Sequence, residues 1–371
     1  MTPLGQRIRD TIAASGPMSV AEYMAACLFD PEHGYYTTRE PFGADGDFTT
    51  APEISQMFGE IVGVWLVAAW RALGSPAPAV IAEIGPGRGT LMKDVLRTIG
   101  RLAPELRSDG RFAMVETSPR LVAVQQRTLG DDAGRVVWST SVDDLPPGPL
   151  FLVGNELFDA VPMRQFVKTA SGWRERLVGL DGAGNLAFFA GLASLDAALL
   201  PPAAADAAEG AVFEVAPART AIMDAVCARL AAQGGAALFF DYGHVTGGLG
   251  DTLQAVRRHR FDPVFASPGE ADLTSHVDFQ ALVEVALGHL LHAATATQGD
   301  FLLAMGLLER AGTLGADADE RRREEIRDEV ERLAAPDRMG DLFKVMAVSR
   351  VPLGIPPFHE PSGRAGSTAA D

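Results

Sequence analysis

A glycine-rich turn between an apolar run and a helical pattern, AVIAEIGPGRGTL at residues 79–91, constrains the fold more than any other stretch. The apolar run is rich in β-branched residues, which suit a strand buried on both faces. Thr90 then begins a helix with apolar residues at helical spacing. Three glycines remove side chains where the backbone must bend or let a ligand approach: Gly85, Gly87 and Gly89. The stretch predicts a strand–turn–helix unit with a small polar ligand at the helix N-terminus.

Two acidic residues near this turn indicate which ligand it binds. Glu83 lies in the strand just before the turn, where a carboxylate can meet an amino group. A second strand, Arg111–Glu116, ends on Glu116, where doubly wound folds place the carboxylate that binds ribose hydroxyls. The spacing G-x-G-x-G departs from the dinucleotide fingerprint and argues against a pyrophosphate. S-adenosylmethionine (SAM) fits, since it carries a ribose and an amino-acid end; an NAD-dependent oxidoreductase is the alternative.

Composition narrows the class of protein. The chain has 371 residues, 47% of them hydrophobic, which is enough for one large core or two modest ones. A net charge of −16 makes nucleic acid an unfavourable partner. Cys27 and Cys227 stand in apolar helical contexts and predict buried free thiols in a reducing compartment. We find neither a membrane-span pattern nor a signal peptide, and therefore expect a cytoplasmic protein. Since no metal-ligand spacing occurs, we expect no metal site.

Alternating strand and helix patterns predict an α/β fold with a seven-stranded doubly wound sheet. Within it we expect one helix from Pro52 to Arg71, and two helices between about Phe301 and Leu333. A loop dense in Tyr, Asp, Thr and Gly precedes Pro52, and its length and aromatic content suggest a functional role. The predicted units are an N-terminal helical cap and substrate loop (1–78), the first half of the core (79–162), an inserted antiparallel sheet and linker (163–210), the second half of the core with a helical insertion near 301–334 (211–355), and a disordered tail (356–371).

Polar clusters follow several of the predicted strands. Asn155, Glu156 and Asp159 come after one strand, and Asp241 comes after another. Ligands in open α/β sheets collect outside the carboxyl ends of the strands, so these residues are candidates for a site. His276 precedes a later helix and is either a functional or a structural histidine, while its neighbours Ser275 and Asp278 suit a helix cap.

Six blocks of the chain carry a resemblance to a known family: GADGDFTTAPEISQMFGE, EIGPGRGTLMKDVL, VETSPRL, GNELFDAVPMRQF, FFDYGH and DLTSHVDF. In this order they resemble the MidA-like family of SAM-dependent methyltransferases, which includes the mitochondrial complex I assembly-factor arginine methyltransferase. The resemblance implies a class I Rossmann-like core, with Gly85, Gly87 and Gly89 around the methionine end of SAM and Glu116 on the ribose. It also implies a protein substrate with an arginine acceptor, such as a subunit of respiratory complex I.

A guanidinium acceptor needs carboxylates that hold its planar fork. Glu156 and Asp159 are the first candidates, and Asn155 is expected to hold the SAM amino group through its carbonyl. Asp47 and Glu53, in the N-terminal loop, are expected to close over the site, and Asp241 to join the same acidic rim. Three matters stay open at this point: a SAM-binding assembly factor with little catalysis, a methyltransferase for a small-molecule acceptor, and the oligomeric state, for which a homodimer is one option.

Overall fold

The computed structural model describes residues 2–38 and 49–358, and its centre is a mixed sheet of seven long strands. The strand order is β15-β16-β10-β5-β2-β3-β4, with β16 antiparallel to both of its neighbours and the short β14 (Val277–Asp278) added beside β10. This arrangement confirms the doubly wound α/β fold. The strands are β2 (Val80–Ile84), β3 (Arg111–Val115), β4 (Val136–Ser139), β5 (Leu150–Asn155), β10 (Gly235–His244), β15 (His292–Thr297) and β16 (Phe343–Ser349).

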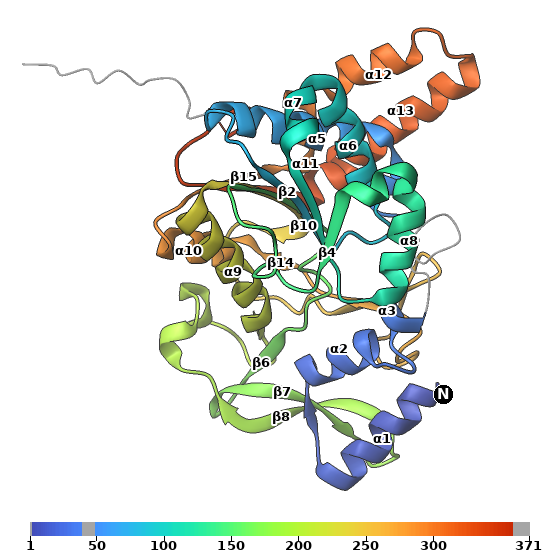
Figure 1. The fold of residues 1–371 in the computed structure, drawn as a ribbon. Helices are drawn as coiled ribbons and strands as arrows, with labels where there is room; N and C mark the ends of the chain where they lie inside the picture. Colours follow the sequence, from blue (N-terminus) through green and yellow to red (C-terminus); the bar gives the residue numbers. More distant parts are fainter. Residues whose placement is uncertain (1, 39–48, 359–371) are drawn as a thin grey trace, which may run out of the picture.

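Helices cover both faces of this sheet, because successive side chains of the buried strands point to opposite sides. In β2, Ile81 packs into the layer of α5 and α6, whereas Val80 and Ala82 pack into the layer of α9 and α10. Figure 1 shows α5 and α6, which flank β2 in the chain, on one side of the sheet, and α9 and α10, which flank β10, on the other. The helices are α5 (Gln56–Ala72), α6 (Thr90–Leu102), α7 (Pro104–Asp109), α8 (Pro119–Leu129), α9 (Pro217–Gln233) and α10 (Phe279–Gly288).

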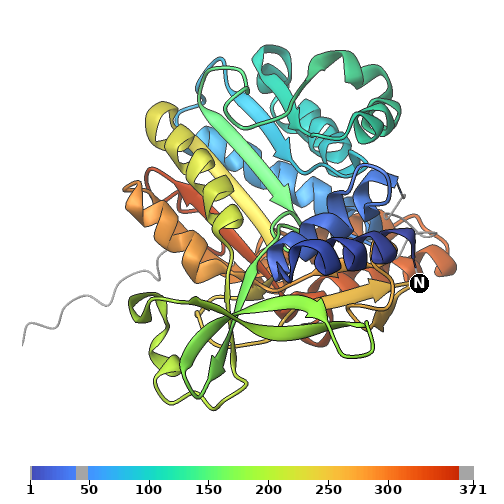
Figure 2. The same cartoon turned by 90° about the horizontal axis from the view of Figure 1, so that it is seen from below.

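A second sheet lies below the main one in Figure 1, beside the N-terminal helices. It consists of β6 (Arg164–Thr169), β7 (Gly172–Leu180), β8 (Leu186–Ser194), β9 (Val212–Val215) and the two residues of β1 (Met18–Ser19). Helices α1 (Pro3–Ser15) and α2 (Val20–Phe29) share an apolar cluster with β7, and Figure 2 shows α1 alongside the sheet. The N-terminal cap and the inserted sheet therefore form one layer. A small third sheet, which we did not expect, contains β11 (Gln254–Arg257), β12 (Arg260–Asp262) and β13 (Asp272–Thr274).

The structure corrects two helix predictions. The helix expected from Pro52 to Arg71 is broken at Ser55, which is extended and separates α4 (Ala51–Ile54) from α5. The Ser55 hydroxyl accepts a hydrogen bond from the Met57 N–H and so begins α5 as its N-cap. Between 298 and 334 there are three helices rather than two, because Gly306 adopts a left-handed conformation between the first and second: α11 (Gln298–Ala304), α12 (Leu307–Gly315) and α13 (Glu320–Ala334).

Two local predictions are confirmed, the cap of α2 and the burial of both cysteines. Ser19 and Glu22 form a reciprocal capping box at the start of α2. Both cysteines are buried and unbonded to one another. Among the described residues, none of the helices combines the length and apolar character needed to cross a membrane. The stretch expected to be a linker contains two short 3-10 helices, Ala197–Leu199 and Pro202–Ala204. Most of the predicted tail, residues 359–371, lies outside the described residues.

Candidate cofactor and acceptor site

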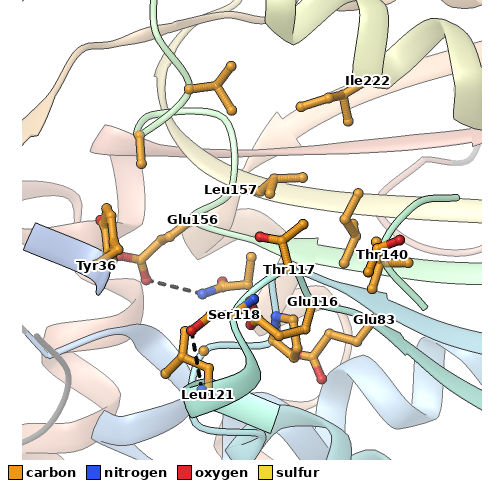
Figure 3. Close-up of a pocket in the computed structure, with 18 of the residues that line it drawn as sticks. Tyr36, Glu83, Glu116, Thr117, Ser118, Leu121, Thr140, Glu156, Leu157 and Ile222 are labelled. Carbon is orange, nitrogen blue, oxygen red and sulfur yellow. Dashed lines mark hydrogen bonds between the residues drawn. The ribbon is translucent and has the colours of Figure 1, made fainter. Parts of the chain in front are cut away.

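A cavity of about 920 Å³ opens at the carboxyl ends of β2, β3 and β5. This volume is at the upper end of the range for small-molecule sites, roughly 300–1,000 Å³. The cavity walls come from the glycine turn, the segments after β3, β4 and β5, and the short helices α3 (Tyr35–Thr38) and α4. Figure 3 shows Glu83 and Glu116 in one part of the wall and Glu156 and Tyr36 in another. The cavity is therefore large enough for a nucleoside ligand and a second group.

The glycine turn at the start of α6 is built for a ligand at close range. Gly85, Gly87 and Gly89 have φ angles of +65°, +50° and +83°, a region in which side chains are strained. A Cβ atom at Gly85 would also lie 2.9 Å from Leu157 Cδ1. All but Gly89 line the cavity, as does Thr90 in the first turn of α6. The N–H groups of a helix start, with its positive dipole end, thus lie beside the cavity.

Two buried acceptor atoms near the turn have no hydrogen-bond partner among the described residues: Glu83 Oε2 and Asn155 Oδ1. Glu83 is only 3% exposed, and its burial raises the pKa of its carboxyl well above the ordinary value. Both residues line the cavity from the adjacent strands β2 and β5. Buried acceptors without donors are costly, so this pair calls for a ligand that donates hydrogen bonds. An ammonium group, such as the amino group of SAM, has the required chemistry.

Glu116 follows β3 and is held in place by neighbouring donors. Its Oε1 accepts a hydrogen bond from the Ser118 N–H at 2.8 Å, and its Oε2 accepts one from Gln125 Nε2 at 3.0 Å. Gln125 is in turn fixed by donating to the Gly87 carbonyl and accepting from Trp138 Nε1. The carboxylate is thereby preorganised to accept two hydroxyl groups, as a ribose requires. The segment Thr140–Asp143, which follows β4, also lines the cavity. The sequence analysis did not single it out, although polar residues after a predicted strand are the same signal that pointed to Glu116.

Glu156 and Asp159 line the cavity on the loop that follows β5. Glu156 accepts hydrogen bonds from the Ala51 N–H at 3.2 Å and from Asn155 Nδ2 at 3.1 Å. Burial and the nearby Asp159 raise the pKa of Glu156 to about 8. Burial also raises the pKa of Asp159 to about 6, although the positive charge of Arg219 opposes this shift. Glu156 has a φ of +51°, which is strained for a residue with a side chain and is typical of functional loops.

Helix α4 joins the two ends of the cavity. The Thr90 hydroxyl, at the glycine turn, donates a hydrogen bond to Glu53, and Arg88 Nη1 lies 3.7 Å from the same carboxylate. The first residue of α4, Ala51, binds Glu156. Glu53 lines the cavity and ties α4 to the glycine turn, and its expected role in closing the site stays a prediction.

Three other expectations have different outcomes. Asp241 is not on the rim: it is fully buried and accepts hydrogen bonds from the N–H groups of Phe158 and Asp159, which brace the loop. His276 is not among the described residues that line the cavity, because its ring packs edge-on against Tyr242. Its neighbour Asp278 is the cap of α10. Asp47 lies outside the described residues.

Arg219 is a site-building residue that sequence reasoning missed. It is 4% exposed and donates to the carbonyls of Asp159, Val161 and His276. It therefore joins the loop after β5 to the segment before α10. Its position in the first turn of α9 carried no signal, since an arginine there usually faces solvent.

Comparison with known proteins agrees with this geometry. A family of S-adenosyl-L-methionine-dependent methyltransferases matches residues 61–296. The chain is 35% identical to the protein arginine methyltransferase NDUFAF7, mitochondrial, of Danio rerio, covering 92% of this chain and 86% of that protein. It is 34% identical to the human protein of the same name, and the match covers 94% of this chain and 83% of that protein.

Among solved structures, a COG1565 superfamily protein from Burkholderia thailandensis, bound to S-adenosyl-homocysteine, matches with a TM-score of 0.78. The two are 32% identical, and the match covers 95% of this chain and 92% of that one. The family match spans more than half of the chain, and the curated relatives cover nearly all of it. This chain therefore belongs to the MidA-like family of SAM-dependent methyltransferases, and its cofactor is SAM.

Proposed function

We propose that this methyltransferase acts on an arginine side chain of a protein, with Glu156 and Asp159 as the carboxylates that hold the guanidinium. The observation that carries the proposal is a pair of carboxyl groups in the cavity whose pKa values are raised, to about 8 and about 6. A buried carboxylate becomes stable when a cation pairs with it. The acidic wall favours a cationic acceptor and disfavours a phosphate or a carboxylate.

Each cofactor residue has a role in this proposal. Glu83 and Asn155 accept hydrogen bonds from the amino group of SAM, Glu116 binds the ribose, and the glycine turn contacts the methionine end. When bound, SAM supplies a methyl group on a positively charged sulfur atom. Glu53 and the rest of α4 exclude water from the space between cofactor and acceptor, where orientation of the reacting atoms accelerates transfer.

Glu156 has two tasks in the transfer. Its carboxylate binds the planar guanidinium and localises a lone pair on the nitrogen that attacks the methyl carbon. Methylation of that nitrogen leaves one proton in excess, and the Glu156 carboxylate, which is ionised beside the guanidinium, can accept it. Asp159 supports the same cation from the next turn of the loop, where the Ala160 N–H and Arg219 hold it.

The acceptor protein is proposed from the relatives, which are named protein arginine methyltransferases of mitochondria. By this analogy, the target is a subunit of respiratory complex I or a similar protein. The N-terminal helices and the sheet β6–β9, which form one layer, are proposed to grip the target polypeptide. A cytoplasmic location and a homodimer stay predictions, as does the role of Asp47.

The test is transfer of labelled methyl groups from SAM into a lysate that lacks the gene, followed by mass spectrometry of the labelled protein. We expect the label on an arginine of a single major protein. A label on a carboxylate, an RNA base or a small molecule would overturn the arginine proposal. Tight SAM binding without transfer of labelled methyl groups would instead favour an assembly factor with little catalysis. The strained backbone of Glu156, with its positive φ, argues against that alternative.

A further inference from the structure

Arg219 is a buried arginine whose hydrogen bonds, among the described residues, all go to neutral oxygens. It is 4% exposed, and it donates to the carbonyls of Val161 at 3.2 Å, His276 at 2.7 Å and Asp159 at 3.2 Å. Its remaining hydrogen bond in this part of the chain goes to the Ser275 hydroxyl. A neutral amide could donate to oxygens of the same kind. These hydrogen bonds therefore explain the donors of Arg219 but not its charge.

The position of Arg219 is unfavourable for a positive charge in two ways. Burial removes the guanidinium from water and lowers the pKa of Arg219. The residue also lies in the first turn of α9, where the helix dipole presents its positive end. Arginine is seldom buried in proteins unless an anion matches its charge. The charge of Arg219 therefore calls for an anion close by.

The Asp159 carboxyl is the cavity group on which this charge acts. Burial raises the pKa of Asp159, and the positive charge of Arg219 is the largest influence in the opposite direction, so that the pKa is about 6. Asp159 is 6% exposed, and its Oδ1 accepts a hydrogen bond from the Ala160 N–H at 2.8 Å. Asp241 and Asp159 in turn favour the charged form of Arg219.

Several other titratable groups face this pair, and among them Arg219 is the permanently charged cation. Those that face Asp159 are Glu156 on its own loop, Asp241 and Tyr242 on β10, and Tyr36 on α3. Those that face Arg219 include Glu214 on β9 and His276 before α10. The nearby carboxyl groups favour protonation of Asp159, because like charges repel. Without Arg219, Asp159 would become a neutral acid at a higher pH.

We propose that Arg219 is a positioning residue that acts through Asp159: it fixes the loop carbonyls and supplies the positive charge that keeps the Asp159 carboxylate ionised for a cationic acceptor. This inference rests on the proposed role of Asp159 in binding the acceptor. An ionised carboxylate attracts a guanidinium, whereas a neutral acid does not. The loop after β5 therefore presents its anion before any acceptor is bound.

The first test follows the ionisation of Asp159 in the full chain without any acceptor. Aspartate is isotope-labelled at its side-chain carboxyl carbon, and the NMR signal of Asp159 is the one absent from Asp159→Asn. The wild type should titrate with a midpoint of about 6. Arg219→Gln keeps an amide donor but loses the charge, and should raise the midpoint by about one pH unit or more. Arg219→Lys keeps the charge but cannot span all four acceptors, and should stay near the wild type.

Arg229→Gln is the matched control. Arg229 lies on the same helix and also donates to backbone carbonyls, those of Leu145 and Pro146, so this variant should leave the Asp159 midpoint unchanged. An unchanged midpoint in folded Arg219→Gln would overturn the inference and leave Arg219 as a brace of the loop. If Arg219→Gln does not fold, Arg219→Lys decides, since a raised midpoint with the charge retained would also overturn it.

The second test separates this inference from the proposed function. It measures binding of N-acetyl-arginine N-methylamide by calorimetry to the full chain loaded with S-adenosyl-homocysteine. At about pH 6, Arg219→Gln should raise the dissociation constant of this probe about fivefold, as expected when the Asp159 midpoint rises by about one pH unit. The dissociation constant of S-adenosyl-homocysteine should not change. If the wild type binds no arginine probe and methylates another group, the proposed function fails, while the NMR midpoints still decide whether Arg219 keeps Asp159 ionised.

Discussion

Glu60 and Glu156 are two glutamates in buried surroundings, and their carboxyl groups behave in opposite ways. Glu60 lies on α5, is 7% exposed and contacts two arginines, with Arg310 Nε at 2.6 Å and Arg97 Nη2 at 3.0 Å. These partners lower the pKa of Glu60 in spite of its burial. Glu156 accepts hydrogen bonds from an N–H group and an amide, while the charge of Arg332 offsets only a minor part of its burial, and its pKa rises to about 8.

The difference separates a carboxylate that joins helices from one that is available to a ligand. Glu60 connects α5 to α6 and α12, and its negative charge is already matched by two positive ones. Glu156 lines a cavity and, in the part of the chain that the structure describes, forms no ion pair; in the proposed reaction the acceptor brings the matching cation. Replacing Glu60 should lower the stability of the fold without changing methyl transfer. Replacing Glu156 should lower methyl transfer without lowering stability.

The largest effect is expected for methyl transfer by Glu156→Gln. The amide keeps the size of the side chain but loses the charge that pairs with the guanidinium, so transfer should fall by about two orders of magnitude or more. The affinity for SAM, measured by calorimetry, should stay near the wild-type value. Glu105→Gln, at an exposed position on α7, is the matched control. Full turnover by folded Glu156→Gln would remove Glu156 from the mechanism.

The next effect concerns stability at Glu60. Glu60→Gln leaves Arg97 and Arg310 beside a neutral group, and should lower the free energy of unfolding by about 2–3 kcal/mol. This is less than for a fully buried pair, because both arginines keep part of their hydration. Denaturant unfolding measures the change, while turnover per folded molecule should equal that of the wild type. A loss of turnover per folded molecule would mean that α5 and α12 act on the site.

The third effect is a gain in stability for Glu156→Gln. The folded-state pKa of about 8 lies above that of an unfolded glutamate, near 4.3, so the folded protein binds the extra proton between these values. The ligand-free wild type should therefore lose the contribution of Glu156 to stability as pH rises from about 4.3 through 8. At pH 8.5, Glu156→Gln should be more stable than the wild type, and the difference should shrink as pH falls and vanish near pH 4. Parallel thermal-unfolding curves at both pH values would contradict the raised pKa.

The smallest effect is expected for the cofactor end of the cavity. Glu116→Ala removes two charge-assisted hydrogen bonds to the ribose, and should weaken SAM binding by roughly tenfold, or about 1.4 kcal/mol. Titration calorimetry is the measurement, with Glu105→Ala as control. A change below twofold would mean that Glu116 only braces the turn through Ser118 and Gln125.

The order of the core could be predicted from the sequence because its signals are local. The strand before Gly85, the glycine spacing and the acidic end at Glu116 all lie within short windows, and period-2 and helical patterns act over the same distances. The break at Ser55 could not be predicted in this way. Residues on both sides of Ser55 suit a helix, but its hydroxyl binds Glu329, which lies far along the chain on α13.

The residues of the candidate site could likewise be predicted from the sequence only in part. Glu83, Glu116 and Glu156 line the cavity, as predicted, because strand ends in a parallel sheet meet at one edge and position along the chain was sufficient to place them there. Asp241 carried the same strand-end signal, and His276 preceded a predicted helix. The Asp241 side chain instead accepts hydrogen bonds from backbone N–H groups, and the His276 ring packs on Tyr242. Side-chain direction at a strand end depends on the neighbours that pack against it.

The sequence alone therefore determined the fold class, the cofactor and the acidic residues at the sheet edge, since each depends on residue type and local spacing. Only the tertiary structure decided which carboxylates are paired and which are not. Arg310 reaches Glu60, and Arg219 reaches the loop of Asp159, from helices far along the chain. Charge pairing is decided by distance in space, and local sequence patterns do not specify that distance.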